Sequence, residues 1–391
     1  IPMALRAKLK RNASILCLVV FTYIVVFKAV HLPAVIDQTD SVLRGLNPQR
    51  CVHDPVPCPR IVYPERDNES LIDLKNFSYV LDAKPCSESG EENLLVLVHS
   101  AADHFAQRDS IRTSWGAGSG WLKNLTIKVV FLLARTPEES LQDLIAHENR
   151  RHGDTVQGDF VDSYHNLTYK HVMGLRWAVD RCASVDHVLK MDDDIFVHLF
   201  RLSEILGSAA AMKPRTILCY VQKQMPVSRS EGGKWRVRES DYPGSFFEDY
   251  CSGWAYITDV GSARAVVAES RFRPYFWVDD VHVTGTLARM AGLTLAKMNR
   301  AFTTEADSLS LWSQDSQRRR LDWRFAFGPT WGDVDLVSRA HRKVLWCRRN
   351  ACACCFRASS GGDAEKDVFG RRSGVKGAAA GRAVVRRVSR R

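Results

Sequence analysis

The chain has 391 residues, of which 45% are apolar, 25% charged and 9% aromatic, and its formal net charge is +11. These are ordinary globular values, so they exclude a chain that is disordered or collagen-like throughout. Most of the charge lies at the two ends, since residues 1–11 carry +4 and residues 347–391 carry +9, which leaves −2 for the body between them. Nucleic-acid-binding proteins carry their basic charge on the folded domain, so this distribution argues against a nucleic-acid partner.

An apolar segment near the amino terminus predicts a membrane anchor. Residues 14–27 are uncharged, and after Lys28 the apolar character continues to Ile36. A bilayer crossing needs ~20 such residues, and the four charges upstream are all basic, which orients the amino terminus towards the cytosol. We therefore expect a cytosolic tail over 1–12 and a single-pass signal-anchor helix over 13–36. A cleaved signal peptide is the alternative, and both interpretations send the body into the secretory pathway.

Two further patterns agree with a secretory location. Four N-x-S/T sequons follow the apolar segment, at Asn68, Asn76, Asn124 and Asn166. The body also contains six cysteines, at positions 51, 58, 86, 182, 219 and 251. Oxidising surroundings favour disulfides among them, although the pairing stays open and some of these cysteines can be buried thiols.

The body divides into a stem and a folded domain. Seven of the fourteen prolines lie between Pro33 and Pro85, so we interpret 37–90 as a lumenal stem. Apolar runs at 94–98, 127–133 and 187–191 predict strands buried on both faces, and helical patterns cover 105–114, 138–151 and 164–182. This alternation predicts an α/β domain over 91–346 with a largely parallel sheet.

The carboxyl-terminal segment 347–391 has a different composition. It is rich in Arg, Gly, Ala and Ser and has few large apolar residues, so we expect a basic disordered tail. Its CACC cluster has the thiols that a metal site uses, but no histidine lies nearby to complete one.

Three consecutive acids, Asp192, Asp193 and Asp194, follow the apolar strand at 187–191. Three adjacent carboxylates at the end of a buried strand are costly unless a positive group meets them. Ligands of open α/β sheets bind at this edge, and a hard divalent cation that also holds a diphosphate suits the acids. The alternative is a solvated acidic turn.

A second acidic pair, Asp279 and Asp280, lies beside Trp277 and Val281. A partly desolvated carboxylate next to another acid has a raised pKa and can serve as a general base, whereas a helix N-cap is the structural alternative. Arg108 and Arg112 are four residues apart and share a helical face. They are positioned either to meet phosphates or to pair with acids.

The ordered combination of these segments resembles glycosyltransferase family 31, the inverting β-1,3-glycosyltransferases of the Golgi. The resemblance runs from about Leu94 to Gly292 and is closest to brainiac-type members. It is carried by LLVLVHSA (94–101), RDSIRTSWG (108–116), KVVFLLA (128–134), GDFVDSYHNLTYKHVMGLRWAVDRC (158–182), HVLKMDDDIFV (187–197), YCSGWAY (250–256) and VDDVHVTG (278–285).

This resemblance implies a GT-A type fold with a Rossmann-like nucleotide-sugar half. The family's DxD motif falls on Asp192–Asp194, with Asp192 and Asp194 as ligands of Mn²⁺ and with Asp192, Asp193, Arg108 and Arg112 on the side of the UDP-sugar. Its catalytic base falls on Asp280, and Asp279 takes the position of the family's glutamate. Family members often carry a metal-ligating histidine where Phe325 aligns here, and a smaller residue where Trp254 stands.

The resemblance thus implies an enzyme of the Golgi membrane that moves galactose or N-acetylglucosamine from a UDP-sugar to the 3-hydroxyl of a glycolipid or glycoprotein acceptor. The alternative is an inactive sugar-binding or scaffolding relative, which the changes at Phe325 and Trp254 motivate. The intact Asp194 and Asp280 argue against it.

Overall fold

The computed structural model describes residues 70–87, 92–120, 122, 125–209, 214–314 and 325–349. The predicted cytosolic tail, the predicted anchor at 13–36 and most of the predicted stem lie outside this range, as do the tail beyond 349, Cys51, Cys58, Asn68 and Asn124. Among the helices of the described part, none has both the length and the apolarity that crossing a membrane requires.

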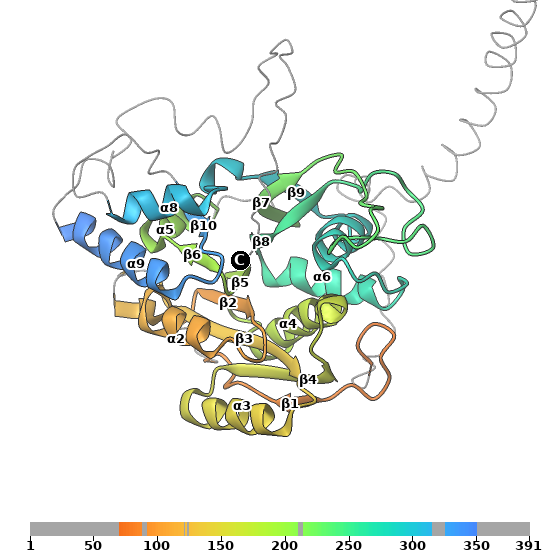
Figure 1. Ribbon diagram of the computed structural model, residues 1–391, viewed down its shortest axis with the longest axis horizontal. Coiled ribbons are helices and arrows are strands. Elements are labelled where there is room, and N and C mark those ends of the chain that lie inside the picture. Colours follow the sequence, from red (N-terminus) through yellow and green to blue (C-terminus); the bar gives the residue numbers. More distant parts are fainter. Residues whose placement is uncertain are drawn as a thin grey trace, which may run out of the picture. The chain divides into compact units, whose positions relative to one another are not determined.

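A central eight-stranded sheet organises the domain (Figure 1), with the strand order β1-β4-β3-β2-β5-β8-β7-β9. Strands β4, β3, β2 and β5 are mutually parallel, whereas β8 runs antiparallel to β5 and β7. A small second sheet pairs β10 with β6. The strands are β1 (Tyr79–Leu81), β2 (Leu94–His99), β3 (Ile127–Arg135), β4 (Thr155–Val161), β5 (His187–Asp192), β6 (Ile195–Val197), β7 (Thr216–Gln222), β8 (Tyr250–Thr258), β9 (Thr294–Lys297) and β10 (Phe327–Pro329).

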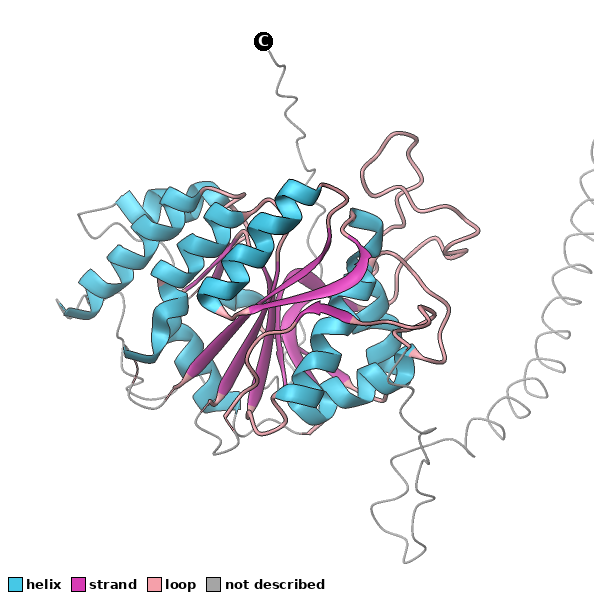
Figure 2. Cartoon of the chain, turned by 90° about the horizontal axis from the view of Figure 1, so that it is seen from below, coloured by secondary structure: helices cyan, strands magenta, loops and turns pink. Residues whose placement is uncertain are grey.

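Helices cover both faces of the sheet (Figure 2). They are α2 (Phe105–Thr113), α3 (Glu139–His152), α4 (Leu167–Arg181), α5 (Leu199–Ala209), α6 (Val260–Ser270), α7 (Ala288–Met290), α8 (Ala306–Gln314) and α9 (Val334–Arg349), with the 3-10 segments η2 (Trp115–Gly120), η3 (Tyr164–Asn166) and η5 (Asn299–Ala301) and the π-helical segment η4 (Val281–Leu287). One core lies between the sheet and α4 with α6, and the other lies between the sheet and α2, α5, α8 and α9.

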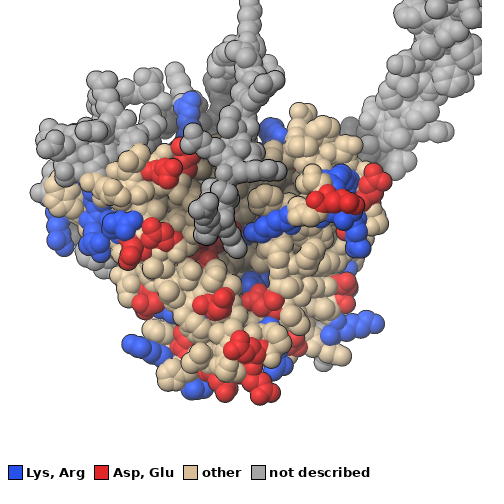
Figure 3. Space-filling model, in the orientation of Figure 1, with Lys and Arg blue, Asp and Glu red and all other residues tan. Residues whose placement is uncertain are grey.

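The three strands and three helices expected from the apolar patterns are confirmed, and so is the mixed α/β class. The pattern at 164–182 differs at its start, where η3 precedes α4. The sheet is largely parallel, as predicted, since β4, β3, β2, β5, β7 and β9 share one direction and only β1 and β8 of this sheet run the other way. On the face seen in Figure 3, acidic and basic side chains are interspersed.

The ordered domain extends beyond both expected boundaries. Residues 70–87 fall within the range predicted as stem, yet they carry β1, which pairs with β4, and Phe77, which is buried in the core. A disulfide joins Cys86 to Cys182 and fixes this segment to the end of α4. At the other end, α9 continues past residue 346 and buries Cys347. Apolar residues are frequent in 70–87 but follow no sustained period, and the prolines from Pro33 to Pro85 made the whole range resemble a stem.

The parallel strands bring the chemistry-bearing segments to one edge. The register of β2 and β5 pairs His99 with Asp192, so the residues after both strands leave the sheet together. Because β8 is antiparallel to β5, the start of β8 lies at the carboxyl end of β5. The edge where open α/β sheets bind ligands therefore holds Asp192–Asp194 and the first residues of β8.

Candidate active site

A buried lysine lies at the centre of the acidic residues. Lys190 belongs to β5 and is 1% exposed, and its Nζ donates to Oδ1 of Asp192 and to the carbonyl of Gly253, both at 2.8 Å. The same Nζ lies 4.0 Å from Oδ2 of Asp279. Burial favours the neutral amine, but Asp192 and Asp279 outweigh it and raise the pKa of Lys190, so the ammonium persists. One cation thus joins the two acidic motifs that the sequence placed 85 residues or more apart.

Asp279 accepts a second interaction from a buried histidine. Nδ1 of His171 lies 2.9 Å from Oδ2 of Asp279, and Nε2 lies 2.9 Å from the Tyr256 hydroxyl. Burial lowers the pKa of His171, so we assign a neutral ring whose Nδ1–H donates to the carboxylate and whose Nε2 accepts from Tyr256. Burial would raise the pKa of Asp279, but the bond from His171 and the ammonium of Lys190 prevail and lower it. Asp279 is therefore an ionised carboxylate whose charge is already balanced by Lys190 and which accepts a hydrogen bond from His171.

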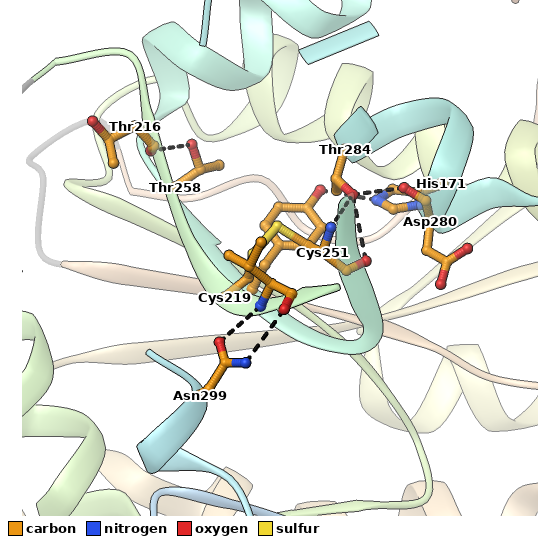
Figure 4. Close-up of a disulfide and its surroundings, with 10 residues drawn as sticks. His171, Thr216, Cys219, Cys251, Thr258, Asp280, Thr284 and Asn299 are labelled. Atoms are coloured by element: carbon orange, nitrogen blue, oxygen red, sulfur yellow. Dashed lines mark hydrogen bonds between the residues drawn. A yellow bond between two sulfur atoms is a disulfide. The ribbon is translucent and has the colours of Figure 1, made fainter. Parts of the chain in front are cut away.

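Asp280 is adjacent but has a different environment (Figure 4). Its Oδ1 accepts from the backbone N–H of Val281, and its carbonyl accepts from the Thr284 hydroxyl. That hydroxyl also accepts from the backbone N–H of Cys251, which forms a disulfide with Cys219 and so ties β8 to β7. The carboxylate is held at the first turn of the π-helical η4, a type of irregularity that is frequent at functional sites.

The environment of Asp280 suits a proton acceptor. Burial and the neighbouring negative charge of Asp279 raise the pKa of Asp280 to about 7. A general base works best when its pKa is close to the operating pH. The two acids therefore divide the roles: Asp279 stays ionised, and its charge makes Asp280 more basic.

Gly253 brings Asp280 and Asp192 to a common space. A Cβ built on Gly253 would lie 3.7 Å from Oδ2 of Asp280 and 3.8 Å from Oδ2 of Asp192. Both oxygens therefore face the same side of β8, next to a position that has no side chain. This arrangement explains the glycine in the motif at 250–256, because the side chain of any larger residue at position 253 would occupy the space beside the two carboxylates.

Asp193, the middle acid, turns away from this space. Its Oδ2 accepts from the Ser100 hydroxyl at 2.7 Å and lies 2.8 Å from Nδ1 of His104. The hydrogen bond to Asp193 raises the pKa of His104, whose side chain is partly exposed at the start of α2. Asp193 thus holds the His104 imidazole at the edge of the sheet and favours its protonated form.

Arg108 and Arg112 pair with acids, which is the second of the two roles that their spacing allowed. The guanidinium of Arg108 is fully buried, and all of its N–H groups meet Glu148, Ser100 or the carbonyls of Ala101 and Ala102. Arg112 forms ion pairs with Glu148 and Asp154. The guanidinium donors are consumed inside the protein, so we assign both arginines to the framework that holds α2 and not to phosphate binding.

The segment that contains Phe325 does approach the acids, but the residue that contacts them is not Phe325. Phe325 is buried and packs edge-on against Trp312, with a centroid distance of 5.3 Å. The residue beside the acidic motif is Thr330, whose N–H and hydroxyl both donate to the carbonyl of Asp194. Phe325 therefore belongs to the apolar core and does not face the acids. The other changed position, Trp254, makes ring contacts with Tyr220 and Phe302.

The residues present fit a hard divalent cation at Asp192 and Asp194. Burial raises the pKa of Asp192 to about 7 and also raises that of Asp194. Within the described residues, Oδ2 of Asp192 has no protein hydrogen-bond donor, and the ammonium of Lys190 is shared by the carboxylates of Asp192 and Asp279. Carboxylate oxygens that lack a hydrogen-bond donor or a cation of their own are available as ligands, and Mg²⁺ and Mn²⁺ prefer such oxygens.

A second group, His99, His171 and Asp279, has ligand atoms within 4.8 Å of one another. His171 already uses both of its nitrogens in hydrogen bonds, and Lys190 contributes to the lowered pKa of His99. A buried ammonium beside these rings disfavours a second cation. We therefore interpret this group as support for Asp279.

Sequence reasoning missed Lys190, His104 and His171. A lysine within the apolar run HVLKM was a usable signal, because a buried lysine requires a partner. The other two contact acids that are 89 and 108 residues away in the sequence, and no local pattern reveals such a pairing.

Comparisons with known proteins point in one direction. A family model described as galactosyltransferase matches residues 106–299. Beta-1,3-galactosyltransferase 1 of Mus musculus is 30% identical over 223 residues, which are 57% of this chain and 68% of that protein. N-acetyllactosaminide beta-1,3-N-acetylglucosaminyltransferase 4 of Homo sapiens is 30% identical over 56% of this chain and 57% of its own length. Beta-1,3-galactosyltransferase 5 of Gorilla gorilla gorilla is 34% identical over 50% and 65%.

Among solved structures, the galactosyltransferase LgtC in complex with donor and acceptor sugar analogs aligns with 64% of this chain and 95% of its own. The TM-score is 0.32 and the identity 12%, so this likeness carries no argument here. The sequence matches do carry one, because they span the acidic motifs and the site built from them. The chain belongs to the galactosyltransferase family.

Proposed function

We propose that this protein is an inverting β-1,3-glycosyltransferase of GT-A type. It moves galactose or N-acetylglucosamine from a UDP-sugar to the 3-hydroxyl of an acceptor sugar. The names of the relatives support these two donor sugars. The observation that carries the proposal is the convergence of Oδ2 of Asp192 and Oδ2 of Asp280 beside Gly253, which supports the roles of cation ligand for Asp192 and general base for Asp280.

Asp280 takes the proton in this reaction. The acceptor's 3-hydroxyl gives its proton to the carboxylate of Asp280 while its oxygen forms a bond to the anomeric carbon of the donor. The bond from that carbon to the UDP oxygen breaks on the opposite face. A single displacement of this kind converts the α-linked donor into a β-linked product.

Asp192 and Asp194 would hold Mn²⁺, and the ion would screen the negative charge of the diphosphate leaving group. Lys190 helps to keep Asp279 ionised and opposes the effect of burial on Asp192, and the hydrogen bond to Asp193 favours the protonated form of His104 at the same edge. His171 fixes the rotamer of Asp279 through a bond whose other end is Tyr256. These residues pre-organise the charges that the transition state needs, so that little reorganisation is required during transfer.

The predicted setting of this activity is the Golgi membrane, with the catalytic domain in the lumen. The amino-terminal apolar segment, the sequons and the two disulfides support it. The motif resemblance to brainiac-type members favours a glycolipid over a glycoprotein acceptor.

A donor and acceptor screen tests the proposal. The full chain is made in a secretory host and purified in detergent, and UDP release is measured from UDP-galactose and UDP-N-acetylglucosamine. Methyl β-mannoside, methyl β-galactoside and methyl β-N-acetylglucosaminide serve as acceptors, with Mn²⁺ or with EDTA. We expect acceptor-dependent release with one donor, lost in EDTA. Measurable UDP binding without release from either donor would support the inactive, sugar-binding alternative.

A further inference from the structure

A long loop, residues 223–249, connects β7 to β8 (Figure 1) and contains an exposed aromatic side chain. Trp235 in this loop is 63% exposed. A single exposed apolar side chain is ordinary, but one held beside a second exposed aromatic ring forms a surface that a ligand can use. An indole ring is also the side chain that most often anchors binding interfaces.

The loop is structured, so Trp235 is held in place. Arg229 donates to the carbonyls of Val237, Tyr242 and Gly244, and Val227 and Val237 make backbone bonds across the loop. Val237 is buried, and it packs in the cluster that also contains Trp277 and Val281. The buried side of the loop therefore rests on the residues that flank Asp279 and Asp280.

A second aromatic ring lies beside Trp235 and comes from a different part of the chain. Tyr164 in η3 is 38% exposed, and the side chain of Lys234, the neighbour of Trp235 in the loop, reaches its ring. Nζ of Lys234 lies 4.9 Å from the Tyr164 ring centre and 5.8 Å from that of Trp235. Tyr164 also packs against Trp277 with a centroid distance of 5.9 Å.

This aromatic pair is close to the reacting groups. Trp277 precedes Asp279 by two residues, and Tyr164 experiences the negative charges of Asp279, Asp280 and Asp192. A ring stacked on Trp235 and Tyr164 would thus lie on the side of the domain where Trp277 and Val281 flank the two acids. The apolar C–H face of a pyranose suits the electron-rich face of an aromatic ring, whereas its hydroxyl groups stay free for polar partners.

We propose that Trp235 and Tyr164 form the platform on which the acceptor sugar ring stacks. This inference rests on the proposed function, because it concerns the acceptor of that same reaction. The occupant is the pyranose that carries the reacting hydroxyl. The donor side is at Asp192 and Asp194, so the platform contributes to acceptor binding and not to binding of the nucleotide.

The test compares Trp235→Ala and Trp235→Phe in the full chain, with Trp346→Ala as the matched control. Trp346 on α9 is 49% exposed and also has a lysine over its ring, since Nζ of Lys343 lies 5.0 Å from the ring centre. We expect Trp235→Ala to raise the KM for the methyl glycoside acceptor about tenfold or more. The KM for the UDP-sugar stays within about twofold of wild type, and Trp235→Phe recovers most of the loss.

A binding measurement separates this inference from the proposed function. Saturation-transfer NMR with the same methyl glycosides, in the presence of UDP and Mn²⁺, reports the contact without turnover. We expect the signal from the sugar C–H protons to fall in Trp235→Ala and to persist in Trp346→Ala. An unchanged acceptor KM, or an undiminished signal in Trp235→Ala, would overturn the platform. Acceptor binding that depends on Trp235 in a protein with no transfer would retain the platform and refute the enzyme.

Discussion

Nζ of Lys190 lies 2.8 Å from Oδ1 of Asp192, in a part of the sheet where the lysine is almost completely buried. A buried ammonium is stable only with partners of opposite charge, and a buried carboxylate has the same need. The two residues are separated by one position on β5, so this strand supplies both the acid and the cation that balances it. The pair also reaches Asp279, which links the acidic motif of β5 to the segment that contains the proposed base.

Replacing Lys190 by Met should impair both stability and transfer. The change leaves Asp192 and Asp279 without their shared cation, and because the Asp192 side chain is 37% exposed, the loss should fall below the value of about 3–5 kcal/mol for a fully buried pair. Thermal unfolding and kcat are the measurements. Lys170→Met is the control, because Lys170 is also buried and pairs with Asp162, yet contacts neither Asp192 nor Asp279. Equal losses of activity in the two variants would reduce Lys190 to a purely structural role.

Replacing Gly253 by Ala should lower transfer and leave stability nearly unchanged. The new methyl group meets its nearest neighbours at 3.7 Å, an ordinary contact distance, but it lies between the carboxylates of Asp192 and Asp280. We expect a fall in kcat/KM with little change in the unfolding temperature. In Gly207→Ala, the control, a Cβ meets nothing within 4 Å, and the variant should gain about 0.5–1 kcal/mol on helix α5. Undiminished kcat/KM in Gly253→Ala would show that the space beside this residue is not used.

Much of this architecture could be predicted from the sequence. The runs at 94–98, 127–133 and 187–191 are apolar on both faces, which is the pattern of central parallel strands, and they fold as such. The acids at 192–194 and 279–280 were identified because they interrupt apolar surroundings. The structure brings both sets to one edge, as expected for residues that follow β5 and border η4.

The remainder depends on contacts between distant segments. Arg108 and Arg112 have the spacing of a phosphate-binding face, but Glu148, 40 residues from Arg108, occupies that face. Residues 70–87 lack periodicity because their structure comes from pairing with β4 and from the bond between Cys86 and Cys182. Trp235 and Tyr164 come from two segments without a periodic sequence pattern, so the sequence alone does not predict that they lie close together.

Replacing Glu148 by Gln should remove a pH-dependent part of the stability. Burial would raise the pKa of Glu148, but Arg108 and Arg112 outweigh burial and lower that pKa below its ordinary value of 4.5. The ionised carboxylate therefore stabilises the fold above about pH 4.5, and this contribution is lost as the pH falls through the lowered pKa. We expect a loss of about 3–5 kcal/mol at pH 7, since Arg108 stays buried without its partner.

Urea unfolding at a series of pH values checks this expectation. The difference between wild type and Glu148→Gln should narrow on acidification, because protonation neutralises the same carboxylate in the wild type. Glu139→Gln is the control, since Glu139 is exposed in the first turn of α3 and its replacement should cost less than about 1 kcal/mol. A difference that stays constant with pH would mean that Glu148 is not the ionised partner of Arg108.

The most direct test of the account is the Asp280→Asn variant, studied by transfer kinetics and by UDP binding in the presence of Mn²⁺. The amide is nearly isosteric but cannot accept the proton of the 3-hydroxyl, so kcat should fall by about 10²- to 10⁴-fold. UDP affinity should stay close to that of wild type. Asp249→Asn, which removes an exposed carboxylate paired with Lys223, should retain full kcat. Wild-type turnover in Asp280→Asn would contradict the account, because it would leave the proposed reaction without its base.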